Sequence, residues 1–168
     1  MTAEVNLLVV CLGNICRSPM AEGALRARLD EAGFDHVRVD SAGTGDWHVG
    51  GPPDSRAVAT AAGHGVDISG LRARQLHDDD YRDFDWLLCA DLQNLRDVRA
   101  RRPEPASARI ELLTRWAGVD ADVDEGVIPD PYTGGRTEFE NVWRMGDAVA
   151  TAAVARLRRR RRRCRPSW

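Results

Sequence analysis

The chain has 168 residues, of which 43% are hydrophobic and 30% are charged, and this length suits one domain with a full core. It has neither a charged-then-apolar N-terminal signal nor an apolar run near 18 residues, which argues against a membrane span and a standard signal peptide. We therefore expect a soluble, cytoplasmic protein. The four cysteines, at positions 11, 16, 89 and 164, match neither a dense disulfide framework nor a paired Cys-x-x-Cys metal site.

The net charge of −2 is unevenly distributed along the chain. Residues 156–168 contain eight arginines and no acid, so subtracting these eight charges from −2 leaves −10 on residues 1–155. We divide the chain into a folded domain over residues 1–157 and an Arg-rich tail over residues 158–168, which we expect to be flexible. The tail is either a solvated extension of the last helix or a contact for an anionic partner such as nucleic acid, an acidic membrane surface or an acidic protein patch.

Strand-like and helix-like segments alternate along the chain. Apolar runs typical of strands occur at residues 5–10, 37–41, 85–90 and 109–113, and helical patterning occurs around residues 19–32, 54–63, 91–101 and 136–157. This alternation predicts an α/β fold with a parallel sheet covered on both faces. Ligands bind such sheets outside the carboxyl ends of the strands, so we expect the functional site to follow the first strand.

Two further segments carry local signals. Asp78-Asp79-Asp80 is interpreted as the start of a short helix, with a metal cluster as the alternative. The segment from Gly118 to Gly135 is rich in Asp, Gly and Pro and has no periodic pattern. Because long irregular loops inside compact domains are usually functional, we expect this one to contribute to the site.

The eight residues Cys-Leu-Gly-Asn-Ile-Cys-Arg-Ser occupy positions 11–18, directly after the first apolar run and before Pro19. A loop between a strand and a helix can turn its backbone N–H groups toward an anion, and the helix N-terminus adds partial positive charge. Gly13 and Asn14 tolerate the left-handed angles that such a loop needs. The segment therefore predicts a phosphate site, distinct from a nucleotide-binding loop ending in Gly-Lys-Ser/Thr.

Cys11 and Arg17 give this loop a chemical role. The donors that bind phosphate also stabilise an ionised Cys11, and the planar fork of Arg17 can hold two phosphate oxygens together. A cysteine at the end of a buried strand is otherwise a small core residue, which is the plain alternative. The pattern favours a nucleophile at the floor of a phosphate cradle.

These residues, with four further segments, resemble one known family. The segments are Cys11 to Pro19, Asp40-Ser41-Ala42-Gly43-Thr44, Ala73-Arg74-Gln75, Asn94-Leu95-Arg96-Asp97 and Asp130-Pro131-Tyr132, and the resemblance to the low molecular weight protein tyrosine phosphatases covers roughly residues 5–155. It implies a three-layer α/β sandwich with a central four-stranded parallel sheet and a phosphate-binding loop after the first strand. It also implies hydrolysis of phosphotyrosine through a phosphocysteine, with neither metal nor cofactor.

The resemblance identifies Asp130 as the general acid and base. By composition alone, Ile-Pro-Asp-Pro-Tyr reads as an ordinary Asp-Pro turn, although flanking prolines restrict its backbone. A carboxyl over the pocket would protonate the leaving phenolate and later take a proton from water. Ser18 is expected to donate its hydroxyl to the Cys11 thiolate.

The remaining candidate residues concern substrate and redox chemistry. We expect Trp47, Tyr132, Leu12 and Ile15 to form the walls around an aryl ring, whereas Trp86, Trp116 and Trp143 belong to the core. Gly13, Asn14, Cys16 and Ser18 complete the predicted substrate-binding loop. Cys16 is either a small packed side chain or, as the resemblance implies, a resolving thiol for oxidised Cys11.

One departure and three rivals qualify the resemblance. Leu71 stands where the family commonly has a His that bonds the loop Asn, so Asn14 needs other partners, for which we predict Ser41 and Ser18.

Arsenate reduction would need a relay of thiols that Cys89 does not offer by its spacing. Arginine phosphatases of this fold carry a Thr where this chain has Ile15. A non-catalytic phosphotyrosine-binding module is disfavoured because Cys11, Arg17 and Asp130 are all present.

Overall fold

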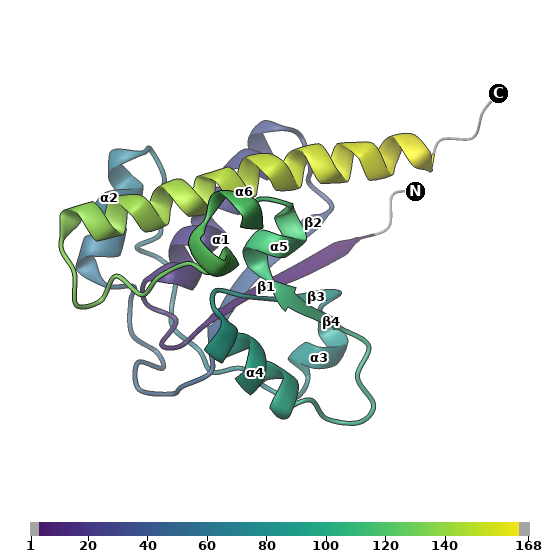
Figure 1. Cartoon of the computed structure of the whole chain (residues 1–168), viewed down its shortest axis with the longest axis horizontal. Coiled ribbons are helices and arrows are strands. Elements are labelled where there is room, and N and C mark those ends of the chain that lie inside the picture. Colours follow the sequence, from purple (N-terminus) through teal and green to yellow (C-terminus); the bar gives the residue numbers. More distant parts are fainter. Residues whose placement is uncertain (1–3, 165–168) are drawn as a thin grey trace.

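The computed structural model describes residues 4–164, and four strands form its central sheet (Figure 1). The strands are β1 (Val5–Cys11), β2 (Val37–Gly43), β3 (Trp86–Cys89) and β4 (Arg109–Leu112). Their order is β2-β1-β3-β4, and every neighbouring pair is parallel. The predicted four-stranded parallel sheet is confirmed, and β1 occupies one of its two central positions.

Helices cover both faces of the sheet. The described residues form the α-helices α1 (Arg17–Glu31), α2 (Ser55–Gly63), α3 (Asp80–Asp83), α4 (Leu92–Ala100), α5 (Leu113–Ala117) and α6 (Arg136–Arg163). Helices α1, α5 and α6 pack on one face with α2 beside them, and α3 and α4 lie on the other. The fold is thus the expected three-layer sandwich.

Alternation along β1 divides the core into two halves. Leu7 and Val9 belong to the core under α1 and α6, whereas Leu8 and Val10 belong to the core under α3 and α4. All four side chains are at most 1% exposed. Successive strand side chains point to opposite faces, so a continuous apolar run is what a strand covered on both faces requires.

Several short elements differ from the sequence-based prediction. The strand predicted over residues 109–113 ends at Leu112, and Leu113 instead begins α5, which stops at Gly118 in the left-handed region with φ 80°. A five-residue helix is too short to show helical periodicity, which explains why it was missed. The acidic run does begin a short helix, α3, and the segment 118–135 contains two single 3₁₀ turns, η1 (Asp120–Asp122) and η2 (Asp124–Gly126).

Helix α6 is longer than the sequence pattern predicts. It continues past the expected boundary at residue 157 to Arg163, so its 28 residues extend about 42 Å. Arg161 docks this end on the body: its guanidinium lies 4.3 Å from the Phe34 ring centroid, and its Nη2 donates to His36 Nδ1 at 2.9 Å. Residues 165–168 of the predicted tail lie outside the described part of the chain. No helix among the described residues is both long and apolar enough to cross a membrane.

Candidate active site

The loop after β1 lies at the carboxyl edge of the sheet, where β1 ends at Cys11 and α1 begins at Arg17. Asn14 adopts the left-handed region with φ 57°, as predicted, whereas Gly13 does not. Gly43 is needed for a different reason, because a Cβ there would lie 2.7 Å from the carbonyl oxygen of Leu12. The end of β2 therefore approaches the loop too closely for any side chain.

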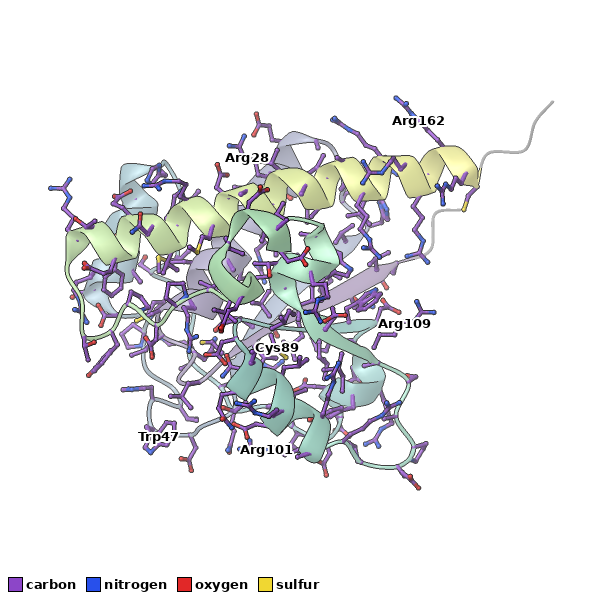
Figure 2. All side chains as sticks on the ribbon, in the orientation of Figure 1. Arg28, Trp47, Cys89, Arg101, Arg109 and Arg162 are labelled. Carbon is purple, nitrogen blue, oxygen red and sulfur yellow. The ribbon has the colours of Figure 1, made fainter. Side chains whose placement is uncertain are left out.

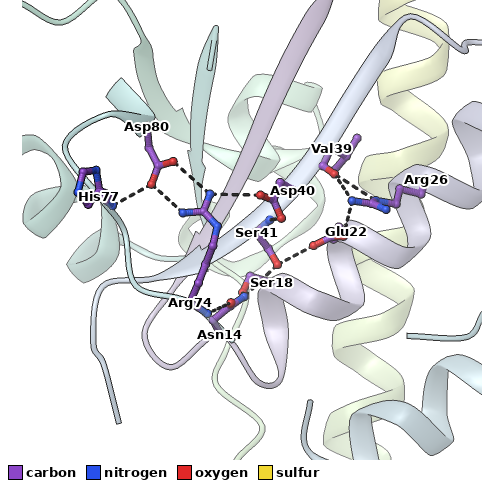
Figure 3. Close-up of polar contacts among 10 residues, drawn as sticks. All are labelled: Asn14, Ser18, Glu22, Arg26, Val39, Asp40, Ser41, Arg74, His77 and Asp80. Atoms are coloured by element: carbon purple, nitrogen blue, oxygen red, sulfur yellow. Dashed lines mark hydrogen bonds and ion pairs between the residues drawn. The ribbon is translucent and has the colours of Figure 1, made fainter. Parts of the chain in front are cut away.

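The side chain of Asn14 connects the loop to three neighbouring residues by hydrogen bonds (Figure 3). Its Nδ2 donates to Ser18 Oγ at 2.8 Å and to Ser41 Oγ at 2.9 Å, and its Oδ1 accepts from the backbone N–H of Arg74 at 3.0 Å. The two serine partners predicted in place of the family His are confirmed. Leu71 instead packs against the hydrophobic core.

Ser18 connects this network to Cys11. Its Oγ lies 2.9 Å from Cys11 Sγ, and both residues are buried. Because Ser18 Oγ already accepts from Asn14, its own proton is free to point at the sulfur. A hydrogen bond donated to sulfur stabilises the thiolate relative to the thiol.

The network continues beyond the loop to Glu22 on α1. Ser41 donates to Glu22 Oε1 at 2.7 Å, and Arg26 Nη2 lies 2.9 Å from Oε2. Burial raises the pKa of Glu22, which is 1% exposed, while Ser41 and Arg26 oppose that shift. On the other side, the Arg74 guanidinium pairs with both Asp40 and Asp80. These contacts hold Asn14 and Ser41 from two sides.

Arg17 is held by an acid that sequence reasoning missed. Its Nη1 donates to Asp91 Oδ2 at 2.6 Å and to the carbonyl of Ile128 at 3.1 Å, and the residue is 4% exposed. Burial alone lowers the pKa of Arg17, but the neighbouring Cys11 and Asp91 raise it above its ordinary value. Asp91 lies two residues after the end of β3 and also caps α4 by accepting from the backbone N–H of Asn94. An acid at the carboxyl edge of a predicted strand was the available signal.

A cavity of about 210 Å³ opens above the loop. Its lining includes every predicted site residue except Asn14 and Ser18, and it is formed by Cys11, Leu12, Gly13, Ile15, Cys16, Arg17, Trp47, His48, Asp130 and Tyr132. His48 was not predicted; it packs on Gly13, where an added Cβ would lie 3.2 Å from its Cδ2. The structure thus brings together three segments that are far apart in the sequence, residues 11–17, 47–48 and 130–132.

Aromatic side chains border the mouth of this cavity. Trp47 is 67% exposed and Tyr132 is 53% exposed (Figure 2 labels Trp47). The Trp47 ring lies against Gly45, since a Cβ there would fall 1.9 Å from the ring. Asp130 lies beside Tyr132, with its Oδ2 3.9 Å from Arg17 Nη2 and its Oδ1 accepting from the Tyr132 N–H.

The other cysteines differ in their surroundings. Cys16 lines the cavity, and burial, helped by Asp54 and Cys11, raises the pKa of its thiol to about 12. Cys89 is buried in the core under α4, on the sheet face opposite to that of Cys11. Cys164 is exposed. Only Cys16 accompanies Cys11 at the site among these three.

Comparison with known proteins agrees with this geometry. Residues 6–163 match the family model for low molecular weight phosphotyrosine protein phosphatase. A low molecular weight protein-tyrosine-phosphatase of Streptomyces coelicolor is 43% identical over 155 residues, covering 89% of this chain and 91% of that protein. The crystal structure of a protein tyrosine phosphatase from Entamoeba histolytica superposes with a TM-score of 0.85 at 28% identity, covering 94% and 99% of the two chains. A drosophila arginine phosphatase superposes with a TM-score of 0.81 at 28% identity, covering 90% and 96%. The chain belongs to the low molecular weight phosphotyrosine protein phosphatase family.

Proposed function

We propose that this protein tyrosine phosphatase carries the phosphoryl group on Cys11 before transferring it to water. The Cys11 sulfur attacks phosphorus, the bond from phosphorus to the tyrosine oxygen breaks, and Asp130 gives its proton to the leaving phenolate. A water oxygen then attacks phosphorus while Asp130 takes one of its protons. The sulfur–phosphorus bond breaks, which releases phosphate and restores the thiolate.

The contact between Ser18 Oγ and Cys11 Sγ at 2.9 Å is the observation that carries this proposal. The proton on Ser18 favours the thiolate as nucleophile and again as leaving group. Arg17, buried and paired with Asp91, is preorganised to bind the equatorial phosphoryl oxygens, where negative charge lies in a loose transition state. Asp130 is the carboxylic acid among the residues lining the cavity.

The lining of the cavity supports an aryl phosphate as substrate. Leu12 and Ile15 offer apolar surface beside the loop, and Trp47 and Tyr132 offer rings at the mouth. A phenyl ring stacked there would bring its phosphate down to Cys11, whereas the shorter phosphoserine would not reach. The physiological partner is therefore a protein carrying exposed phosphotyrosine, and we expect it to be met in the cytoplasm.

A comparison of substrates tests this function. We expect rapid hydrolysis of p-nitrophenyl phosphate and of a phosphotyrosine peptide, with little on phosphoarginine and no reduction of arsenate. Ile15 disfavours the phosphoarginine reaction, and Cys89 faces the other side of the sheet, away from a thiol relay. Faster turnover of phosphoarginine, arsenate reduction, or phosphotyrosine binding without hydrolysis would each replace the proposal by the corresponding rival.

We propose that Cys16 resolves oxidised Cys11. Because the pKa of Cys16 is raised to about 12, its thiol is protonated at neutral pH and peroxide oxidises Cys11 first. The Cys16 sulfur then attacks the Cys11 sulfenic acid, forming a disulfide and releasing water.

Replacing Cys16 by Ser should leave the initial rate nearly unchanged, since serine keeps the size of the buried side chain. After a peroxide pulse, recovery with a dithiol should be much poorer in the variant, because over-oxidation of Cys11 is no longer prevented. Activity before and after treatment measures this. Equal recovery of variant and wild type would remove the resolving role.

We also propose that the basic end of α6 binds an anionic polymer, with nucleic acid favoured. Arg158 to Arg163 are all exposed, and none of them pairs with a described carboxylate. Consecutive helical residues point in different directions at about 100° per residue, so the charge surrounds the helix. Arg162 points into solvent beyond the body (Figure 2). Residues 158–163 are all arginines and present no apolar face for insertion into lipid, whereas a flexible polyanion can wrap around them.

Removing residues 158–168 should leave kcat on p-nitrophenyl phosphate unchanged but abolish binding to single-stranded DNA. The docked end of α6 lies near Phe34 and His36, at the opposite end of β2 from the phosphate loop. Binding should be measured at about 50 mM salt, where screening is weak, and should weaken as salt rises. If the full chain binds anionic vesicles but not DNA, the partner is a membrane surface. If it binds neither vesicles nor DNA, the proposal of an anionic partner is refuted.

A further inference from the structure

Arg56 joins the segment that carries the proposed acid to the rest of the site. It lies in the first turn of α2. Its Nη2 donates to the carbonyl of Tyr132 at 3.0 Å, and its Nη1 donates to the carbonyl of Gly134 at 3.1 Å. One side chain thus holds two backbone positions just after Asp130, in a segment with little secondary structure of its own.

Asp54 fixes Arg56 and connects it to the phosphate loop. Its Oδ1 accepts a hydrogen bond from Arg56 Nε at 3.0 Å, and its Oδ2 accepts one from Nη2 at 2.9 Å. The two residues thus form a bidentate salt bridge. The backbone N–H of Asp54 donates to the carbonyl of Ile15 at 2.8 Å. Hydrogen bonds from Arg56 lower the pKa of Asp54 below its ordinary value, which favours the ionised form of the pair. The link therefore persists throughout the neutral and mildly acidic range.

Two aromatic rings complete the contacts of Arg56. Its guanidinium lies 4.6 Å from the ring centroid of Phe139 and 5.6 Å from that of Tyr132. Phe139 is fully buried in the first turn of α6, so it gives the guanidinium a rigid surface. Because the Arg56 side chain is 41% exposed, these charged contacts are partly screened, and their main effect is geometric.

The contacts of Asp130 show why this anchoring matters. Its Oδ1 accepts from the N–H of Tyr132 at 3.1 Å, and its Oδ2 is 3.9 Å from Arg17, too far for a hydrogen bond. The carboxyl is thus oriented by its own backbone, and that backbone is held at Tyr132 by Arg56. We infer that Arg56 is a positioning residue, which holds Asp130 over the phosphate loop so that its proton reaches the leaving oxygen.

This inference rests on the proposed role of Asp130, and one substitution separates positioning from a general structural role. Arg56→Met keeps an apolar side chain against Phe139 but removes the guanidinium group that makes the hydrogen bonds. We expect kcat/KM for phenyl phosphate to fall roughly 10- to 100-fold, since a misplacement of about 1 Å in a reacting group has effects of this size. The loss should be much smaller for p-nitrophenyl phosphate, whose leaving group needs less protonation. Inhibition by inorganic phosphate should change less than about twofold, because Arg17 and the loop are untouched.

Two controls accompany this variant. Arg144→Met removes the same charge from an exposed position of α6 and should match wild type in both assays. Arg56→Lys keeps the charge without the fork, so it should recover only part of the loss. If Arg56→Met proves unstable in thermal unfolding, Arg56→Lys carries the same comparison of leaving groups and phosphate inhibition.

A double-mutant cycle with Asp130→Ala completes the test. Adding Arg56→Met to Asp130→Ala should cause little further loss, because the group being positioned is already absent. Fully additive losses, an equal loss for both phosphate esters, or weakened phosphate inhibition would each show that Arg56 does not act through Asp130. A large effect of Asp130→Ala with none of Arg56→Met would overturn the positioning role alone. A silent Asp130→Ala would overturn the proposed acid, and this inference with it.

Discussion

Replacing Cys11 by Ser should abolish hydrolysis of phenyl phosphate, while inorganic phosphate should still bind. A serine hydroxyl stays protonated at neutral pH, so neither the hydrogen bond from Ser18 nor the positive charge of Arg17 makes it a competent nucleophile. The backbone of the loop and the Arg17–Asp91 pair do not involve the sulfur, so the phosphate cradle remains. Steady-state turnover and phosphate binding by calorimetry measure the two expectations.

The exposed Cys164 supplies the matched control for this change. Cys164→Ser should retain full activity, which separates loss of the nucleophile from a general effect of losing a thiol. Turnover of Cys11→Ser above roughly 1% of wild type would contradict the assignment, because removal of a nucleophile from a catalytic unit costs several orders of magnitude. Loss of phosphate binding would instead show that the sulfur is needed to shape the cradle.

Replacing Asp130 by Ala should lower kcat/KM for phenyl phosphate by roughly 10²- to 10⁴-fold, the usual size of general acid catalysis. Asp130 lines the cavity, and its Oδ2 lies 3.9 Å from Arg17 Nη2, beyond hydrogen-bond distance, so its removal leaves the Arg17–Asp91 pair in place. Phosphate inhibition should therefore be preserved. The measurement is a series of aryl phosphates with leaving groups of increasing acidity.

The loss in that series should shrink as the leaving group becomes more acidic, because a stable phenolate departs without a proton. Asp122→Ala is the control, since Asp122 is an exposed acid in the same irregular segment. A loss of equal size for all leaving groups would count against proton donation by Asp130. It would indicate that the carboxylate serves the structure of the segment or the binding of substrate.

The identity of Asp130 could not be derived from composition or spacing. Its residues read as an Asp-Pro turn, and the family resemblance alone singled it out. Arg17 and the carbonyl of Ile128, just before this turn, are 111 positions apart in sequence yet 3.1 Å apart in space. Such a juxtaposition depends on the order of the strands and the path of α6, neither of which leaves a local pattern.

The sequence by itself determined the strands and the chemistry of the first loop. Strand β1 is a run of apolar residues because both its faces are covered, and Gly13, Asn14 and Pro19 carry local turn and helix-start preferences. Periodicity and turn propensity act over a few residues, so they can be read without the fold. For the same reason the elements with weak local signals, α5 and the last six residues of α6, were missed or shortened.

The tertiary structure decided which groups hold that loop in its working geometry. Asp91 reaches Arg17 because β3 lies beside β1 in the sheet order β2-β1-β3-β4, which brings their carboxyl ends together. Asp54 and Arg56 link Ile15 to Tyr132 because α2 packs beside α6. These partners are 39 or more positions apart, and their contacts arise only when packing has brought the elements into register. Local sequence therefore specifies the proposed nucleophile, Cys11, and long-range packing specifies its surroundings, the charge partner of Arg17 and the position of the proposed acid, Asp130.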